Sequence, residues 1–175
     1  MGHYDAVADH RRPCRVSMLM LKTLHILSAA ILFGTGIGIA FFAWFGSRRA
    51  LRAADIGALR TILRLTVLAD FCFTAPAVLV QLGTGYALVR LLGWSFSSPW
   101  MLAVGGLFAL VGLCWLPVVW IQMRLSRVAE QTPDVKALPT SFHRLFAWWF
   151  VLGIPAFAAM LALFWVMVAK PFSMS

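Results

Sequence analysis

The chain has 175 residues, of which 62% are hydrophobic and 12% are charged, whereas about 25% of the residues in soluble globular domains are charged. This composition excludes a soluble domain, because so few polar side chains could not cover its surface in water. The net charge is +9, but the Lys and Arg residues lie mainly between apolar runs. They therefore indicate membrane topology and contacts with lipid headgroups, and they argue against a nucleic-acid partner.

Four apolar runs are long enough to cross the hydrocarbon core of a bilayer, which takes about 20 helical residues. The predicted spans are residues 19–45, 67–89, 100–121 and 146–168. Because backbone polar groups in lipid must be paired within each segment, these runs are expected to be helices. The sequence therefore predicts an all-α membrane protein, in which residues 19–171 form a bundle of four transmembrane helices.

Residues 1–18 form a polar N-terminal tail, and Met18 and Met20 offer alternative start sites that would leave this tail out of the native chain. Nine of the 15 Lys and Arg residues lie in the loops after the first and third spans. The other six, three of them in the tail, lie on the opposite side. This bias predicts that the two basic loops are cytoplasmic and that both termini are extracytoplasmic.

The first span carries a histidine, a residue that is costly in lipid and therefore expected to face the bundle interior. His25 shares a helical face with Ser28 and Gly36. Nearby, Gly34 and Gly38 have a GxxxG spacing, and such small residues let a second helix or a flat cofactor approach the backbone. Two interpretations of His25 remain open: a neutral side chain hydrogen-bonded to a neighbouring helix, or a cofactor ligand.

The second span carries a polar face, because Asp70, Thr74 and Gln81 recur at helical spacing. A face this polar must look inward. Asp70 has two interpretations, an ion pair with Arg64 or Arg124 that locks helix ends together, or a proton relay.

Neighbouring spans are expected to run antiparallel, so residues of different spans can be compared by depth. On the outer side, His25 is level with Gln81, Met101 and Met167. On the inner side, Asp70 is level with a second set of polar residues, among them Gln122, Arg124 and His143. The sequence therefore predicts two polar layers, an outer one with an imidazole and two thioethers and an inner one with a carboxylate and arginines. His143 is expected to be a solvated interfacial residue, with a ligand role as the alternative.

Several short sequence motifs along the chain resemble those of known families. They are Leu24-His25, Leu32-Phe33-Gly34-Thr35-Gly36, Ala69-Asp70-Phe71, Thr74-Ala75-Pro76, Trp115-Leu116-Pro117 and Ala169-Lys170-Pro171. Together they resemble the bacterial membrane family called domain of unknown function 2269, which implies a multi-pass protein of the bacterial inner membrane. More distantly, the four spans, the early His25 and the Thr-x-Pro phrase resemble HemJ-type protoporphyrinogen oxidase.

The HemJ resemblance implies a haem b site with His25 as an axial ligand. The HemJ pattern has a His and a Lys at the start of the third span, and this chain has Pro99-Trp100-Met101 there, without either residue. A Met can also ligate haem iron. The first hypothesis is therefore a haem b-binding membrane redox protein that acts on a quinone or a porphyrin-like molecule. The second axial ligand is expected to be Met101 or Met167. Lys22 and Lys170 are expected near the haem propionates, and Gly34 and Gly38 are expected to form the small face beside the ring.

The second hypothesis is a protein without a cofactor, either a membrane subunit or a small permease-like protein. In this case Asp70, Thr74 and Gln81 line a polar path or an interface. Four helices are few for a transporter alone, so this hypothesis implies a homo-oligomer or a partner. Haem absorbance of the purified protein distinguishes the two hypotheses.

Overall fold

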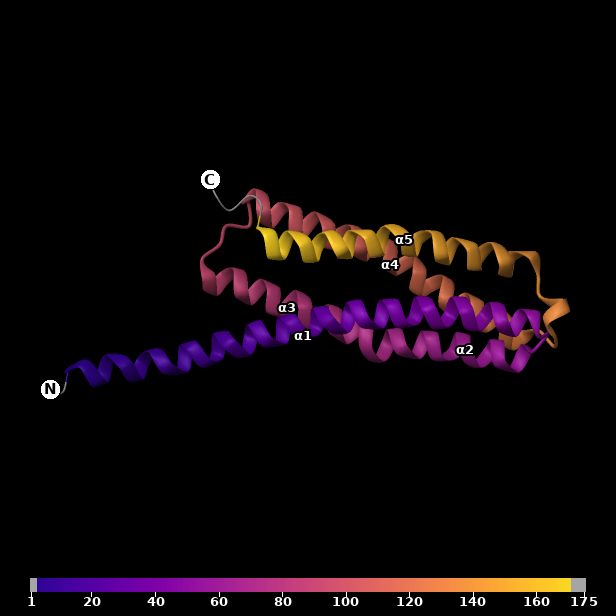
Figure 1. Cartoon of the computed structure of the whole chain (residues 1–175), viewed down its shortest axis with the longest axis horizontal. Coiled ribbons are helices and arrows are strands. Elements are labelled where there is room, and N and C mark those ends of the chain that lie inside the picture. The colour runs from indigo at the N-terminus through magenta and orange to yellow at the C-terminus, as the bar shows by residue number, and fades with distance from the viewer. Residues whose placement is uncertain (1–2, 171–175) are drawn as a thin grey trace.

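The computed structural model describes residues 3–170, and the side chains of residues 17–170. Within that range the chain is helical and has no strand. Its long helices are α1 (His3–Arg52), α2 (Ile56–Ala69), α3 (Ala75–Leu92), α4 (Pro99–Gln131) and α5 (Thr140–Ala169). The π-helix η1 (Asp70–Thr74) joins α2 to α3 without a break, and the short 3₁₀ helix η2 (Val135–Ala137) lies between α4 and α5 (Figure 1).

Four helical segments are long and apolar enough to cross a membrane. They are Ser17–Arg52, Ile56–Leu92, Pro99–Gln131 and Thr140–Ala169. Large apolar side chains point outward from them, for example Leu79 at 71% exposure and Leu113 at 70%. Such a surface suits lipid and not water. The prediction of an all-α, four-helix membrane bundle is confirmed.

The helices extend past the predicted spans, and the loops between them are therefore shorter than predicted. α1 reaches Arg52, and α2 begins at Ile56, where the Asp55 carboxylate accepts a hydrogen bond from the Ala58 amide at 2.9 Å. Ser98 caps α4 in the same way, and Gly93 ends α3 in the left-handed conformation that favours glycine. Backbone residues 3–16 of the predicted tail continue α1 as a helix.

The helices form two pairs that meet at one end. α1 packs along the continuous helix α2–η1–α3, and α4 packs along α5. α2 also contacts α4, so the pairs close together where α1 ends and α2 begins, and they diverge towards the C-terminus (Figure 1). The largest buried cluster lies at the closed end and includes Leu59, Leu63, Leu125 and Phe142.

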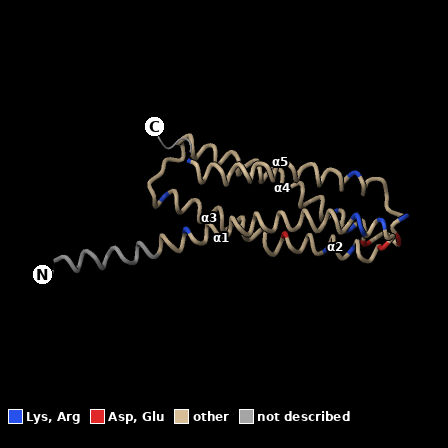
Figure 2. Tube along the Cα trace, viewed as in Figure 1, with Lys and Arg blue, Asp and Glu red and all other residues tan. Residues whose placement is uncertain are grey.

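Basic residues are concentrated at this closed end, as Figure 2 shows, and we call it the basic end. The other end, where α5 finishes, is the C-terminal end. Its loop is held by Trp100, which donates a hydrogen bond to the Val166 carbonyl at 3.0 Å. Lys170 lies over the rings of Trp94 and Trp100, with its ammonium 5.0 and 5.8 Å from their centroids. The two ends therefore differ in charge, as the sequence predicted from its loops.

Candidate functional site

Two polar clusters lie between the helices. The first, which we call the His25 cluster, consists of His25 and Ser28 on α1 and Gln81 and Thr84 on α3. The His25 Nδ1 lies 2.9 Å from Thr84 Oγ1, and its Nε2 lies 3.0 Å from Gln81 Nε2. Ser28 donates a hydrogen bond to Gln81 Oε1. Both ring nitrogens of His25 are thus engaged by α3.

The hydrogen-bond pattern assigns the protons of this cluster. Thr84 donates its hydroxyl hydrogen to the Val80 carbonyl at 2.6 Å, so its oxygen accepts from His25 Nδ1–H. Nε2 of His25 then carries no proton and accepts from the Gln81 amide. Each polar side chain has a partner, and the imidazole is neutral. The arrangement is the hydrogen-bonded histidine that the sequence offered as one of two interpretations.

The predicted haem contacts lie on several helices. Met101 on α4 and Met167 on α5 are half-buried. Lys22 is exposed, and Lys170 lies against Trp94 and Trp100. Among residues 17–170, no group of three or more His, Cys, Asp or Glu side chains could hold a metal ion.

The glycines of the first span have no helix against them. A Cβ added at Gly34 or Gly38 would meet no atom within 4 Å. Of the two expected roles of this spacing, contact with a second helix is not formed at Gly34 and Gly38, and approach of a flat cofactor stays a prediction. The close approach is instead at Gly85 on α3, where an added Cβ would lie 3.3 Å from Cε1 of His25. Gly85 lets the imidazole lie flat against α3, a role that its spacing in the sequence did not reveal.

The second polar cluster, the Asp70 cluster, consists of Asp70, Thr74, Trp115 and Gln122. Asp70 is only 4% exposed, and Thr74 and Gln122 are also buried. Trp115 on α4 donates its indole N–H to Asp70 Oδ1 at 3.4 Å, and the side chains of Thr74 and Gln122 lie next to the same carboxyl group. Asp70, Thr74 and Gln122 are thus buried, and Gln81 is half-buried in the other cluster.

Several polar atoms of the Asp70 cluster are buried without a partner. They are Asp70 Oδ2, Thr74 Oγ1 and Gln122 Oε1. Because unpaired polar atoms in lipid are costly, a cluster of three calls for an explanation. The His25 cluster has no atom in this state among the described side chains.

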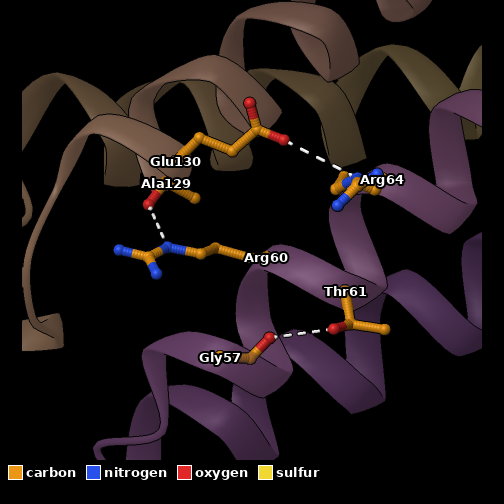
Figure 3. A network of polar contacts seen from close by, with 6 residues as sticks. All are labelled: Gly57, Arg60, Thr61, Arg64, Ala129 and Glu130. Carbon is orange, nitrogen blue, oxygen red and sulfur yellow. Dashed lines mark hydrogen bonds and ion pairs between the residues drawn. The ribbon is translucent and has the colours of Figure 1, made fainter.

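The expected ion pair between Asp70 and an arginine is not formed. Arg64 instead pairs with Glu130 on α4 at 3.7 Å, and Arg60 donates to the Ala129 carbonyl at 3.0 Å (Figure 3). Arg124 was expected to be buried, but it is exposed and lies 5.7 Å from the ring centroid of Trp120. The extension of α4 to Gln131 explains the first error, because it includes Glu130, the carboxylate with which Arg64 pairs.

Asp70 begins η1, where the backbone departs from the α-helical pattern. The Ala75 amide bonds to the Asp70 carbonyl five residues back, as in a π-helix. Pro76 follows, and it has no N–H to hold the preceding turn in α-helical register. Single π-turns of this kind are frequent at functional sites. Pro76 was the only signal of this turn in the sequence, and it does not by itself specify a π-turn.

The remaining candidates lie apart from the clusters. His143 is exposed at the basic end and contacts the ring of Phe142 edge-on. Cys72 is exposed and Cys114 is buried, and both are free thiols. Cys14 lies outside the described side chains. His143, Cys72 and Cys114 join no donor set among the described side chains.

Residues 19–171 match the family described as "Predicted integral membrane protein (DUF2269)". The match covers most of the chain, so the chain belongs to this family of integral membrane proteins. No curated protein and no solved structure matches the chain.

Proposed function

We propose that this DUF2269 family member binds and releases a proton at Asp70 inside the membrane, as a small permease-like subunit. The observation that supports this proposal is the buried Asp70 carboxyl group, which lacks a basic partner within residues 17–170 and has an unpaired Oδ2. An ionisable residue inside a membrane span is costly to keep, and it commonly marks a path for ions or protons.

The surroundings of Asp70 suit the protonated acid better than the carboxylate. A carboxylate without a counter-charge costs several kcal/mol to bury. In the acid form, Oδ2 gains a hydrogen to donate, and Thr74 and Gln122 next to the carboxyl group each have a buried oxygen without a donor. One proton can thus pair two of these atoms. Releasing it requires a compensating change, such as entry of water, a cation or a shift of the helices.

The polar face of η1 and α3 extends from this acid towards the C-terminal end. Asp70, Thr74, Gln81 and Thr84 follow one another at helical spacing, and the last two contact His25. Asp70 thus lies on this helix face, and His25 of α1 contacts the same face nearer the C-terminal end. Because four helices enclose little space, a complete path would form in a homo-oligomer or with a partner protein.

The orientation and location of the protein belong to the same proposal. The basic end carries the excess of Lys and Arg and would face the cytoplasm of a bacterial cell, with both termini outside and the bundle in the inner membrane. Reporter fusions at Gly57 and Ser97 test this. Phosphatase activity at Gly57 with none at Ser97 would reverse the orientation.

Infrared spectroscopy tests the protonated acid directly. We expect the protein at neutral pH to show the C=O band of a buried carboxylic acid, lost in Asp70→Asn and kept in Asp134→Asn. Asp134 is a matched control, because it is exposed and only caps η2. Absence of the band from the wild-type protein would refute the proposal. Proton uptake into proteoliposomes, followed with an internal pH dye, should fall in Asp70→Asn alone.

Haem b binding with a redox role is the second candidate function. It is favoured by the hydrogen bond from His25 Nδ1 to Thr84, because histidines that ligate a metal commonly hold the other nitrogen in this way. Haem would then supply electron transfer to a quinone or a porphyrin-like substrate, with Met101 or Met167 as the other ligand. The Gln81 amide, however, occupies Nε2, and it would have to move first. For this reason the geometry favours the first proposal.

Absorbance decides this second candidate. If it holds, protein made under haem-replete conditions shows a Soret band, and His25→Ala loses most of it. Protein without Soret absorbance under these conditions would exclude haem. Haem that survives His25→Ala unchanged would place the site elsewhere, with His143 as the next residue to test.

A further inference from the structure

A pocket of about 610 Å³ lies on the last turns of α1, at the basic end. Its lining consists of Trp44, Phe45, Arg48, Arg49, Arg52 and Ala53. Three guanidinium groups and two aromatic rings thus share one small surface. The pocket begins at Trp44 and Phe45, the last residues of the predicted first span, and extends about two helical turns beyond them, in the zone where lipid headgroups meet protein.

The three arginines of the pocket have no acidic partner. Among residues 17–170, the only carboxylate within 4 Å of an arginine is that of Glu130, which pairs with Arg64 on α2. The nearby acids are engaged elsewhere, since Asp55 caps α2 and Asp134 caps η2. The pocket therefore carries three positive charges that the protein itself leaves uncompensated.

The arginines of α2 behave differently, and the contrast identifies the pocket as a binding surface. Arg60 donates to the Ala129 carbonyl at 3.0 Å, as Figure 3 shows, and also to the Thr132 carbonyl at 2.7 Å, so it connects α2 to the end of α4. These guanidinium groups hold the fold together. Those of Arg49 and Arg52 make no hydrogen bond or ion pair within the described side chains, so they are available to a ligand.

The aromatic part of the pocket is rigid and continues into the apolar surface. Arg48 lies 4.1 Å from the ring centroid of Trp44, and Trp44 stacks on Phe150 of α5 at 4.1 Å. Phe45 contacts Phe41 one turn deeper, and both rings are exposed. A ligand that fits has an anionic head for the arginines and an apolar tail for the exposed rings.

We propose that this pocket binds the phosphate headgroup of an anionic phospholipid. Guanidinium groups bind phosphate oxygens by charge-assisted hydrogen bonds, and arginine suits this geometry better than lysine. The Phe41 and Phe45 rings provide the surface for an acyl chain. The site is independent of the proton-binding role of Asp70, and it would anchor the basic end of α1 in the lipid headgroup layer.

Native mass spectrometry of the full chain in detergent tests this, with phosphatidylglycerol as the probe and phosphatidylcholine as the uncharged comparison. The variant Arg48→Gln/Arg49→Gln/Arg52→Gln should weaken phosphatidylglycerol binding about tenfold or more. The control Arg127→Gln/Lys136→Gln/Arg144→Gln removes the same charge from exposed positions of the same end and should bind like wild type. The single variant Arg52→Gln should weaken binding measurably while keeping the fold.

Three outcomes would overturn the proposal. Equal weakening of phosphatidylglycerol binding in the site variant and the control would show that binding depends on net charge alone and not on this pocket. Equal binding of phosphatidylcholine and phosphatidylglycerol would remove the role of the arginines. Displacement of phosphatidylglycerol by millimolar inorganic phosphate would make the pocket a site for free anions, and not for lipid.

Discussion

The His25 cluster and the Asp70 cluster both use the polar face of η1 and α3, yet their hydrogen bonding differs. His25, Ser28, Gln81 and Thr84 form a closed network between α1 and α3. Asp70 accepts a long hydrogen bond from Trp115 and lies beside Thr74 and Gln122, and buried oxygens of this cluster stay without a partner. A network in which every polar group is paired stabilises a helix pair in lipid, whereas a network with unpaired oxygens can form a further hydrogen bond when a proton binds. The first cluster therefore has the character of a structural contact and the second that of a site.

The largest expected effect comes from removing one polar group from each cluster. His25→Leu should destabilise the detergent-solubilised protein by about 1–3 kcal/mol, because it leaves the Gln81 amide and the Thr84 oxygen without their partner. Gln122→Leu should cost less, because Thr74 Oγ1, a second unpaired oxygen beside the carboxyl group, can take over as acceptor for the Asp70 proton. Thermal and denaturant unfolding measure both variants. A loss for Gln122→Leu as large as that for His25→Leu would contradict the comparison.

Asp70→Asn sharpens the comparison further, because it should separate function from stability. The amide keeps an oxygen for the Trp115 indole and offers an N–H to Gln122 Oε1, so stability should stay equal or rise by up to about 1 kcal/mol. Proton uptake in proteoliposomes should nevertheless be lost. If instead an unseen counter-charge balanced Asp70, the same substitution would lower the unfolding midpoint and indicate a structural ion pair.

The sequence predicted the general fold well, for a physical reason. Lipid permits few backbone structures, so four apolar runs of sufficient length require helices. The lengths of the helices were less predictable, because residues such as Ile56 and Gln131 extend helices beyond the membrane, where hydropathy gives no signal. The arginine-rich segments were expected to be loops, and they are helix ends.

The two polar layers were predicted from helical spacing, but their partners were not. Depth placed Gln81 level with His25, and these side chains do meet. Depth also placed Met101 and Met167 at this level, and their role as haem ligands stays a prediction. Arg64 lies within reach of Asp70 in sequence, yet it faces Glu130, because the pairing depends on how α2 rotates against α4.

Gly83 and Gly85, two residues apart on α3, provide a test with a smaller expected effect on the hydrogen-bond network of His25. Gly85→Ala would bring a methyl group to 3.3 Å from the His25 ring, and hydrogen bonds at both nitrogens prevent that ring from moving aside. Gly83→Ala meets open space. Alanine favours a helix over glycine by about 1 kcal/mol, so Gly83→Ala should raise the free energy of unfolding. The free energy of unfolding of Gly85→Ala should be lower than that of Gly83→Ala by a similar amount. Equal unfolding midpoints for the two variants would show that His25 can shift freely.

The smallest expected effect is at the basic end, where Arg60 and Arg64 bind α4 in different ways. Arg64→Gln removes an exposed ion pair with a separation of 3.7 Å, and such pairs contribute about 0–1 kcal/mol. Arg60→Gln removes two hydrogen bonds to carbonyls that have no other partner at the end of α4, and it should cost more, about 1 kcal/mol. High salt should reduce the effect of Arg64→Gln and leave most of that of Arg60→Gln, because screening weakens exposed charge pairs more than partly buried hydrogen bonds. Unfolding measured at low and high salt checks both variants. An Arg64→Gln loss that persists in high salt would mean that the Glu130 pair contributes to the closed end of the bundle through packing as well as charge.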